Sequence, residues 1–365
     1  MVYRAIGIVS GSSLNGLDLA FAEVQETSGR WTAEILAAER FPYTAAWKDK
    51  LRAAASLNVK AHLQLHIEYG RYIAETVRKF IDTNNLHFKV QLIACHGHTS
   101  VYDPAHHICS VLGDGATIAA LTGINVVTDV RCIDLSLGGK GAPIYPIAEK
   151  LLFPDNHISL HLGANAVLSG HHNNFYQSLE VCPANKLLDM IAQRDDKPFD
   201  PAGAMAAEGK LDSRLLTIIN ELEYYRLPYP KTLSLDFASD VIYPLVDDLS
   251  LTVQDALRTV VEHIAVQVAS AFRYLNQQHQ FPSGRLMLTG GGANNEFLVS
   301  RIAGNLAADG VEIIVPDKST VNFKESLAMA LIGILRWREE NNVFSYITGA
   351  SRDSIGGAVW IGQEA

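Results

Sequence analysis

Cysteine is scarce in this chain, with 4 among 365 residues. None of the four stands in a Cys-x-x-Cys spacing, and four are too few to cross-link a chain of this length. A disulfide framework is therefore excluded, and we expect reduced and mostly buried thiols. The residues are Cys95, Cys109, Cys132 and Cys182.

Long apolar runs and an excess of basic residues are also missing. No run approaches the ~20 apolar residues that a membrane span requires, and the opening stretch MVYRAIGIVSGSS lacks the charged and apolar regions of a secretory signal. Asp and Glu number 39 against 30 Lys and Arg, which gives a formal charge of −9. General nucleic-acid binders carry the opposite excess, because they neutralise phosphates. We expect a cytoplasmic protein that binds neither membranes nor nucleic acids.

What the chain does contain is the composition of a folded protein with two lobes. Hydrophobic residues make up 48% and charged residues 19% of the chain, an ordinary globular mixture. A length of 365 residues exceeds one ordinary core and suits two lobes of roughly 150 to 180 residues. We predict an N-terminal lobe over residues 1–150 and a C-terminal lobe over residues 151–365.

Each predicted lobe opens with a strand, a turn and a second strand. Residues 3–9 and 17–24 flank SGSSLNG, and residues 158–162 and 167–169 flank Gly163 and Ala164. Helical periodicity follows over 45–85, 252–277 and 324–337. The pattern predicts an α/β fold in which each lobe is a mixed sheet with flanking helices. This arrangement resembles the duplicated ribonuclease-H-like plan of actin and the sugar kinases.

Short apolar runs that end in polar loops predict buried strands that deliver a binding site. Ligands of open α/β sheets bind at the carboxyl ends of the strands, so we expect binding residues in these loops. The runs are 90–95 before HGHT, 108–112 before GDG, 125–128 before TDVRCIDLSLGGKGAP and 285–288 before TGGGANN.

Two glycine-rich segments each allow two interpretations. In the opening turn, residues 11–16, glycines permit close backbone approach, and amide and hydroxyl groups can hold phosphate oxygens. Asn15-Gly16 is also a strong signal for a plain hairpin turn. The segment TGGGANN, residues 289–295, precedes a predicted helix whose N-terminus could face a nucleotide. It could equally be a turn that needs glycine for packing.

Histidines and carboxylates supply the remaining candidates. His96 and His98 could bind a metal, transfer protons or bond to sugar hydroxyls, but no Cys or carboxylate cluster of metal-ligand spacing accompanies them. A phosphotransferase needs a carboxylate near the acceptor and others for hydrated Mg²⁺. The sequence alone does not rank the acidic candidates, which are Asp18, Asp114, Asp129, Asp134, Glu180 and Asp189.

Seven segments together resemble the anhydro-N-acetylmuramic acid kinases, in order and spacing, from residue 7 to the end. The resemblance implies an enzyme of peptidoglycan recycling that uses ATP and Mg²⁺ to open the 1,6-anhydro ring of an amino sugar, adding water at C1 and phosphate at O6. It also implies a possible homodimer. The segments are GIVSGSSLNGLD (7–18), HGHT (96–99), LGDG (112–115), TDVRCIDLSLGGKGAP (128–143), TGGGANN (289–295), KESLAMA (324–330) and TGASRDSIGGAVW (348–360).

The resemblance also implies a set of site residues. Glu180, in LEVCPAN, stands where the family has its aspartate base. Substrate recognition is expected from His96, Asp114, Arg131 and Asp134, with the planar guanidinium of Arg131 suited to a lactyl carboxylate. The residues expected on the nucleotide are Gly11, Ser12, Ser13, Asn15, Gly16, Asp18, Gly290, Gly291, Gly292 and Asn294.

Several positions depart from the family pattern. Asn15 replaces an aspartate, and Ala164, Cys182 and Ala184 replace glycines, which predicts stiffer loops. Glu180 carries its carboxylate ~1.5 Å farther from the backbone than aspartate, and displacements of about 1 Å can cost ~100-fold in rate. A second hypothesis follows, in which the chain binds nucleotide or sugar as a sensor or interaction protein without transferring phosphate.

Overall fold

The computed structural model describes residues 1–11, 14–229, 231, 233–234, 236–282 and 284–363. The chain forms two compact units, each described here by itself. Unit 1 comprises Met1–Pro154 and Phe323–Ala365, and unit 2 comprises Asp155–Asn322. This division differs from the predicted lobes in residues 151–154 and 323–365, which belong to unit 1. The C-terminal residues join unit 1 because 327–335 pack against the first strand and the last strand, β13 (Ala358–Trp360), pairs with β7 (Asn125–Thr128).

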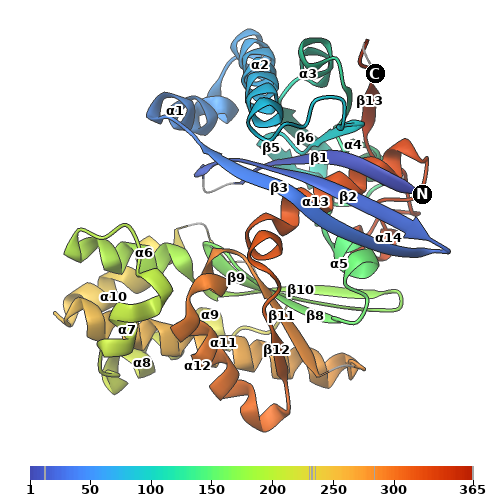
Figure 1. Ribbon diagram of the computed structural model, residues 1–365. Helices are drawn as coiled ribbons and strands as arrows, with labels where there is room; N and C mark the ends of the chain where they lie inside the picture. The colour runs from blue at the N-terminus through green and yellow to red at the C-terminus, as the bar shows by residue number, and fades with distance from the viewer. Residues whose placement is uncertain (12–13, 230, 232, 235, 283, 364–365) are drawn as a thin grey trace. The chain divides into compact units, whose positions relative to one another are not determined.

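Unit 1 is built on a mixed sheet of six strands in the order β13-β7-β4-β1-β2-β3 (Figure 1). β1, β2 and β3 form an antiparallel meander, whereas β4 and β7 run parallel to β1. The bounds not yet given are β1 (Val2–Ser10), β2 (Gly16–Thr27), β3 (Arg30–Pro42) and β4 (Leu92–Cys95).

Both faces of this sheet are covered, and the alternation of β1 explains why. Ile6 and Ile8 pack in one apolar cluster with α2, while Ala5 and Val9 pack in another with α13. Between Ala5 and Val9, residue 7 must be glycine, because a Cβ there would come within 1.8 Å of the carbonyl oxygen of Ser326 on α13. The helices of unit 1 are α1 (Ala45–Ala53), α2 (Val59–Thr83), α3 (Gly115–Thr122), α4 (Cys132–Ser136), α5 (Pro146–Leu152), α14 (Ser345–Thr348) and most of α13 (Lys318–Trp337).

One predicted strand lies outside the main sheet. β6 (Ile108–Leu112) was expected beside the parallel strands, but it pairs only with β5 (His98–Asp103) in a separate sheet of two strands among the described residues. HGHT is therefore not wholly a loop, because its last two residues begin β5. Partial exposure fits the position of β6 outside the main sheet, because a strand within that sheet would be buried on both faces.

Unit 2 holds a mixed sheet of five strands in the order β10-β9-β8-β11-β12. β8 (Ile158–Leu162), β9 (Asn165–His172) and β10 (Phe175–Pro183) form a meander, and β11 (Arg285–Thr289) and β12 (Glu312–Ile314) run parallel to β8. Figure 1 shows the long helix α11 lying across a face of this sheet. The helices are α6 (Asn185–Ala192), α7 (Ala204–Glu208), α8 (Ser213–Asn220), α9 (Glu223–Arg226), α10 (Tyr243–Asp248), α11 (Val253–His279) and α12 (Glu296–Leu306).

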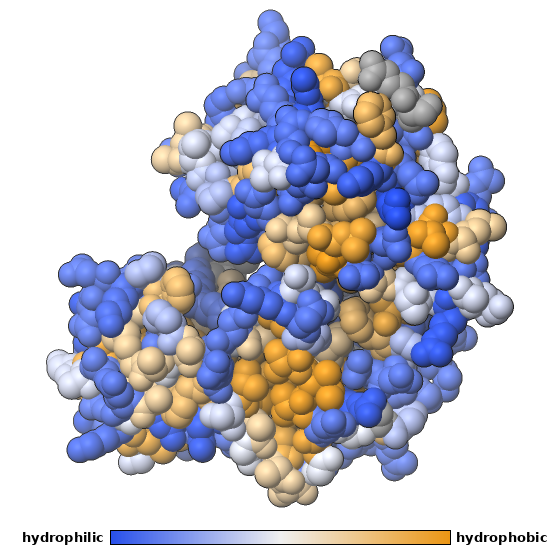
Figure 2. Space-filling view, viewed as in Figure 1, coloured by the Kyte–Doolittle hydropathy of each residue, from blue (hydrophilic) through white to orange (hydrophobic). Residues whose placement is uncertain are grey.

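The predicted fold class is confirmed, since each unit is a mixed sheet with flanking helices that opens on a β-hairpin. All four cysteines are free; Cys95 and Cys182 are buried, Cys109 is half-buried and Cys132 is exposed, so the expectation of mostly buried thiols holds for two of the four. No helix in the described part of the chain is long and apolar enough to span a bilayer. Figure 2 shows polar side chains over most of one face of the chain, with apolar side chains in separate patches.

Candidate functional site

The opening turn joins β1 to β2 in unit 1. The amide of Leu14 donates to the carbonyl of Gly11 at 3.1 Å, and Leu14 has a φ of 53°, so the backbone turns sharply here. A Cβ on Gly16 would lie 2.5 Å from the carbonyl oxygen of Phe41 on β3, so packing alone requires this glycine. Asn15 is exposed. Ser12 and Ser13 lie outside the described residues.

Asp18 forms a close ion pair at the start of β2. Arg40 donates from Nε to Oδ1 at 2.6 Å and from Nη2 to Oδ2 at 2.7 Å. Ser326, on α13, donates from its hydroxyl to the Asp18 carbonyl at 3.2 Å. The Asp18 carboxylate, whose side chain is 20% exposed, is therefore largely neutralised from within unit 1.

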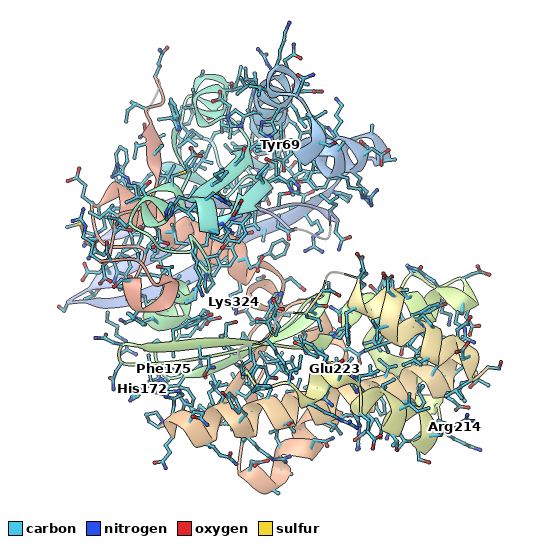
Figure 3. All side chains as sticks on the ribbon, turned by 180° about the vertical axis from the view of Figure 1, so that it is seen from behind. Tyr69, His172, Phe175, Arg214, Glu223 and Lys324 are labelled. Carbon is cyan, nitrogen blue, oxygen red and sulfur yellow. The ribbon has the colours of Figure 1, made fainter. Side chains whose placement is uncertain are left out.

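Glu325 is a further carboxylate in this region, and it is not among the site residues predicted from the sequence. Burial raises its pKa, and the charges that act on it include Lys324, Asp18 and Arg40. The neighbouring Lys324, labelled in Figure 3, instead pairs with Glu149 at 2.8 Å, and both side chains are 8% exposed. The available signal was the segment KESLAMA, which places a carboxylate among residues that pack against β1.

The carboxyl ends of β4 and β7 bring His96 and Arg131 together. Arg131 Nη2 lies 2.9 Å from His96 Nε2, and His96 Nδ1 lies 3.2 Å from the carbonyl oxygen of Gly97. Burial and the neighbouring guanidinium lower the pKa of His96 to about 3. The Tyr102 ring centroid is 5.7 Å from the Arg131 guanidinium carbon. Arg131 Nε is buried with no hydrogen-bond partner, and no ion pair of Arg131 occurs among the described residues.

The two aspartates expected near the sugar have partners inside unit 1. Asp114 caps α3, accepting a hydrogen bond from the amide of Thr117 at 2.8 Å. Asp134 is 1% exposed and accepts from the amide of Gly141 at 2.7 Å and from the hydroxyl of Thr348 at 2.6 Å. These bonds give Asp134 a structural function, because they tie the loop after α4 to α14. Contact of either aspartate with a sugar stays a prediction.

In unit 2, three backbone segments meet around the turn between β8 and β9. The amides of Ala184 and Asn185 donate to the carbonyls of Ala164 and Gly163 at 2.8 and 3.1 Å. The Asn185 side chain donates to the carbonyl of Leu162 at 3.0 Å. This turn and the start of α6 therefore form one rigid backbone cluster.

The glycine-rich loop packs onto the same cluster. Gly290 has a φ of 84°, and a Cβ there would lie 2.7 Å from the Leu162 carbonyl oxygen. A Cβ on Gly292 would also lie 2.7 Å from the Leu162 side chain, whereas Gly291 is exposed. Asn294 is exposed and donates to the carbonyl of Gly291 at 3.2 Å. The loop therefore needs its glycines for packing and still presents Gly291 and Asn294 to solvent.

The residues that replace family glycines do not occupy left-handed backbone. None of Ala164, Cys182 and Ala184 is among the described residues with positive φ. Ala164 is exposed, and Cys182 is wholly buried in the apolar core of unit 2. Ala184, which precedes α6, has a φ of −127° and a ψ of −104°, outside the regions of regular helix and strand.

Glu180 lies on β10, and one carboxylate oxygen and its main-chain carbonyl are engaged within unit 2. Its Oε2 accepts from the amide of Leu233, and its backbone carbonyl accepts from the Tyr224 hydroxyl at 2.6 Å. Lys231 donates to the carbonyl of Tyr224 at 2.9 Å. Tyr224 and Leu233 are therefore held against β10 beside the candidate base. Asp189, one helical turn after Asn185 on α6, is a second candidate for the base. Burial raises the pKa of its carboxyl group to about 6, so it holds a proton more readily than an exposed aspartate.

Comparison with known proteins covers both units. A model of the anhydro-N-acetylmuramic acid kinase family matches residues 3–362. The anhydro-N-acetylmuramic acid kinase of Synechococcus elongatus is 29% identical over 98% of this chain and 99% of its own length. That of Rhizorhabdus wittichii is 32% identical over 82% of this chain and 83% of its own length. Component A of (R)-2-hydroxyglutaryl-CoA dehydratase from Acidaminococcus fermentans superposes with a TM-score of 0.46 at 14% identity, covering 91% of this chain and 97% of its own. With a family model matched over nearly its whole length, the chain belongs to the anhydro-N-acetylmuramic acid kinase family.

Proposed function

We propose that the chain is an ATP-dependent kinase of 1,6-anhydro-N-acetylmuramic acid, or of a closely related anhydro amino sugar, that couples ring opening to phosphorylation of O6. The observation that carries the sugar assignment is Arg131, a half-buried guanidinium with a buried, unpartnered Nε and no ion pair in the described part of the chain. A guanidinium left in this state favours a carboxylate, which it binds through paired hydrogen bonds. The lactyl group supplies that carboxylate.

The residues proposed for the nucleotide are taken unit by unit, on the family resemblance. In unit 1 they include the half-buried Gly11 and the exposed Asn15, and in unit 2 the exposed Gly291 and Asn294. The glycine-rich loop stands immediately before α12, whose N-terminus carries partial positive charge. Ser12 and Ser13 are also proposed as phosphate contacts, because the family resemblance implies that role.

Mg²⁺ is proposed to be held with few protein ligands. In the part of the chain that the structure describes, no three His, Cys, Asp or Glu side chains gather closely enough to hold a metal ion. Mg²⁺ in kinases keeps several waters and binds through one or two carboxylates and the substrate phosphates, so Asp18 and Glu325 are the carboxylates proposed for it. For Asp18 this requires Mg²⁺ to replace Arg40 at one oxygen, and for Glu325 it requires the ionised form that burial disfavours. When bound, Mg²⁺ neutralises charge that develops on the transferred phosphoryl group.

Glu180 is proposed as the base. It takes a proton from water while the water oxygen bonds to C1 and the bond between C1 and O6 breaks; O6 then attacks the γ-phosphorus, and ADP leaves with the bridging oxygen. Because Oε2 accepts from Leu233, the other oxygen, Oε1, is the one assigned to the water. The bond to Leu233 also orients the carboxylate.

The test is a coupled ADP assay on the purified full chain with the anhydro sugar, ATP and Mg²⁺, together with mass spectrometry of the sugar product. We expect ADP release above a no-sugar control and a product heavier by one water and one phosphoryl group. ADP without that product would show simple ATP hydrolysis. The absence of both ADP release and the phosphorylated product would refute the proposal.

A binding protein without transfer is the alternative, and two observations favour it. Glu180 is already engaged by Leu233, and Asn15 lacks the charge that the family has at that position. Sugar-dependent turnover that disappears in Glu180→Gln while sugar binding persists would rule this alternative out. Calorimetric binding of the sugar with no turnover under any metal condition would support it.

Location and assembly follow from the family resemblance only. A cytoplasmic location and a homodimer are proposed on that basis. Light scattering on the purified chain measures the assembly state directly, and fractionation of cells measures the location.

A further inference from the structure

The hydrogen bonds of His96 determine where its ring proton lies. An arginine can only donate, so Arg131 Nη2 at 2.9 Å requires a lone pair on His96 Nε2. The proton is then on Nδ1, which faces the carbonyl oxygen of Gly97 at 3.2 Å. The main-chain amide of His96 donates to Ile8 on β1 at 2.9 Å, and the residue is 8% exposed. The imidazole is thus a fixed, neutral acceptor.

A neutral acceptor affects Arg131 differently from a carboxylate. An aspartate at this position would hold the guanidinium and also cancel its charge, as Asp18 does for Arg40 in the same unit. His96 holds one amino group and leaves the charge uncompensated. The Tyr102 ring, with its centroid 5.7 Å from the guanidinium carbon, restrains the group without neutralising it. Arg131 is therefore held in place with its full charge available to an external anion.

We propose that His96 is a positioning residue for a carboxylate-binding Arg131, and does not itself contact the sugar. Its neutral Nε2 accepts from Nη2 and turns the guanidinium so that its remaining donors, including the buried Nε, face the carboxylate of the ligand. The assignment of that carboxylate to the lactyl group rests on the proposed function. This assignment replaces the expectation that His96 hydrogen-bonds sugar hydroxyls.

The test compares glutamine with asparagine at residue 96. The Oε1 of His96→Gln reaches the position of Nε2 and can accept from Arg131, whereas the shorter side chain of His96→Asn reaches only the position of Nδ1. Binding is measured by calorimetry on the full chain with a non-hydrolysable ATP analogue. The ligands are 1,6-anhydro-N-acetylmuramic acid and 1,6-anhydro-N-acetylglucosamine, which lacks the lactyl carboxylate.

We expect His96→Asn and His96→Ala to weaken binding of the muramic sugar by roughly 10- to 100-fold, the cost of a hydrogen bond to a charged group. We expect His96→Gln to stay within about threefold of the parent chain, and the sugar without the carboxylate to bind all variants alike. Arg131→Ala should cost less in the His96→Ala background than in the parent chain, because the two residues serve one function and their losses do not add. His62→Asn, at a half-buried histidine of unit 1 that bonds to Ser100 and not to Arg131, controls for damage to folding.

Two results of the binding experiment overturn the proposal. One is an equal loss with both sugars, which would mean that His96 contacts the sugar itself or only supports the fold. The other is a loss in His96→Gln as large as in His96→Ala. ¹⁵N spectra of labelled histidine supply a readout that needs no sugar: a proton on Nε2, or a charged ring at neutral pH, also overturns it.

Failure of the proposed function is separable from failure of this inference. D-lactate and N-acetylmuramic acid serve as simpler carboxylate probes. If the parent chain binds either through Arg131 but not the anhydro sugar, the substrate assignment falls and the positioning function of His96 stands. If it binds none of these carboxylates, both fall.

Discussion

Loss of Lys324 should destabilise unit 1 strongly, because it leaves a buried charge without its partner. Lys324 Nζ lies 2.8 Å from Glu149 Oε1, and each side chain is 8% exposed. Removing one member of such a pair typically costs ~3–5 kcal/mol, whereas replacing both by apolar residues is often neutral. We therefore expect Lys324→Met to lower the free energy of unfolding by about 3–5 kcal/mol. The double variant Lys324→Met/Glu149→Leu should recover most of that loss.

The assay can be confined to unit 1. All four tryptophans, Trp31, Trp47, Trp337 and Trp360, belong to it, so tryptophan fluorescence during urea unfolding reports on this unit. With an m-value of about 2–3 kcal/mol/M, the expected loss moves the midpoint down by roughly 1–2 M. A cost below about 1 kcal/mol for Lys324→Met would refute the reasoning. So would a double variant as unstable as the single one.

Three further predictions concern unit 2. Glu180→Gln should lower kcat by about 100-fold or more while sugar affinity stays unchanged, because general-base catalysis contributes 10²–10⁴-fold; parallel rate and calorimetric titrations check this, and unchanged kcat would exclude Glu180 as the base. Gly290→Ala should cost about 1–3 kcal/mol in thermal unfolding, because φ is 84° and a Cβ would lie 2.7 Å from a carbonyl oxygen. Gly304→Ala, inside α12 with nothing within 4 Å of its Cβ, is the matched control and should stabilise by ~0.5–1 kcal/mol. Glu262 is buried, which opposes ionisation, but hydrogen bonds led by that from Arg301 lower its pKa to about 2. Its stabilisation, ~3 kcal/mol at most, is therefore complete above its unfolded pKa of about 4.5 and is lost as pH falls toward 2. Acid titration of the unfolding midpoint should show a weaker dependence in this window for Glu262→Gln, and an unchanged slope would contradict the assignment.

Elements with strong local periodicity were predicted well. The hairpin of β1 and β2 and the helix α11 (Val253–His279) correspond to the predicted strands at 3–9 and 17–24 and the predicted helix at 252–277. Their patterns are local, because burial on a sheet face repeats every two residues and burial on a helix face about every 3.6. The seven family segments were also recognisable in the sequence, and the family that they indicated is the one that the comparisons show.

Elements whose position depends on distant partners were predicted less well. Nothing in residues 358–360 indicates that they pair with β7, more than 200 residues earlier. β6 has the composition of a core strand but pairs only with β5 among the described residues. Local periodicity records which side of a strand is apolar, and it does not record which strand lies beside it.

The same distinction applies to the candidate site. The sequence by itself determined the α/β class, the two opening hairpins, the family and the identity of Arg131 as a carboxylate-binding candidate. Only the tertiary structure decided that His96 bonds to Arg131, that Asp134 is enclosed, and that Glu325 is a carboxylate whose pKa is raised by burial. The physical reason is that the residue type determines whether a side chain can donate a hydrogen bond, accept one or carry a charge. The partners that folding brings together determine which of these functions the side chain performs. His96 and Arg131 are 35 residues apart in the sequence, and Asp134 and Thr348 are 214 residues apart.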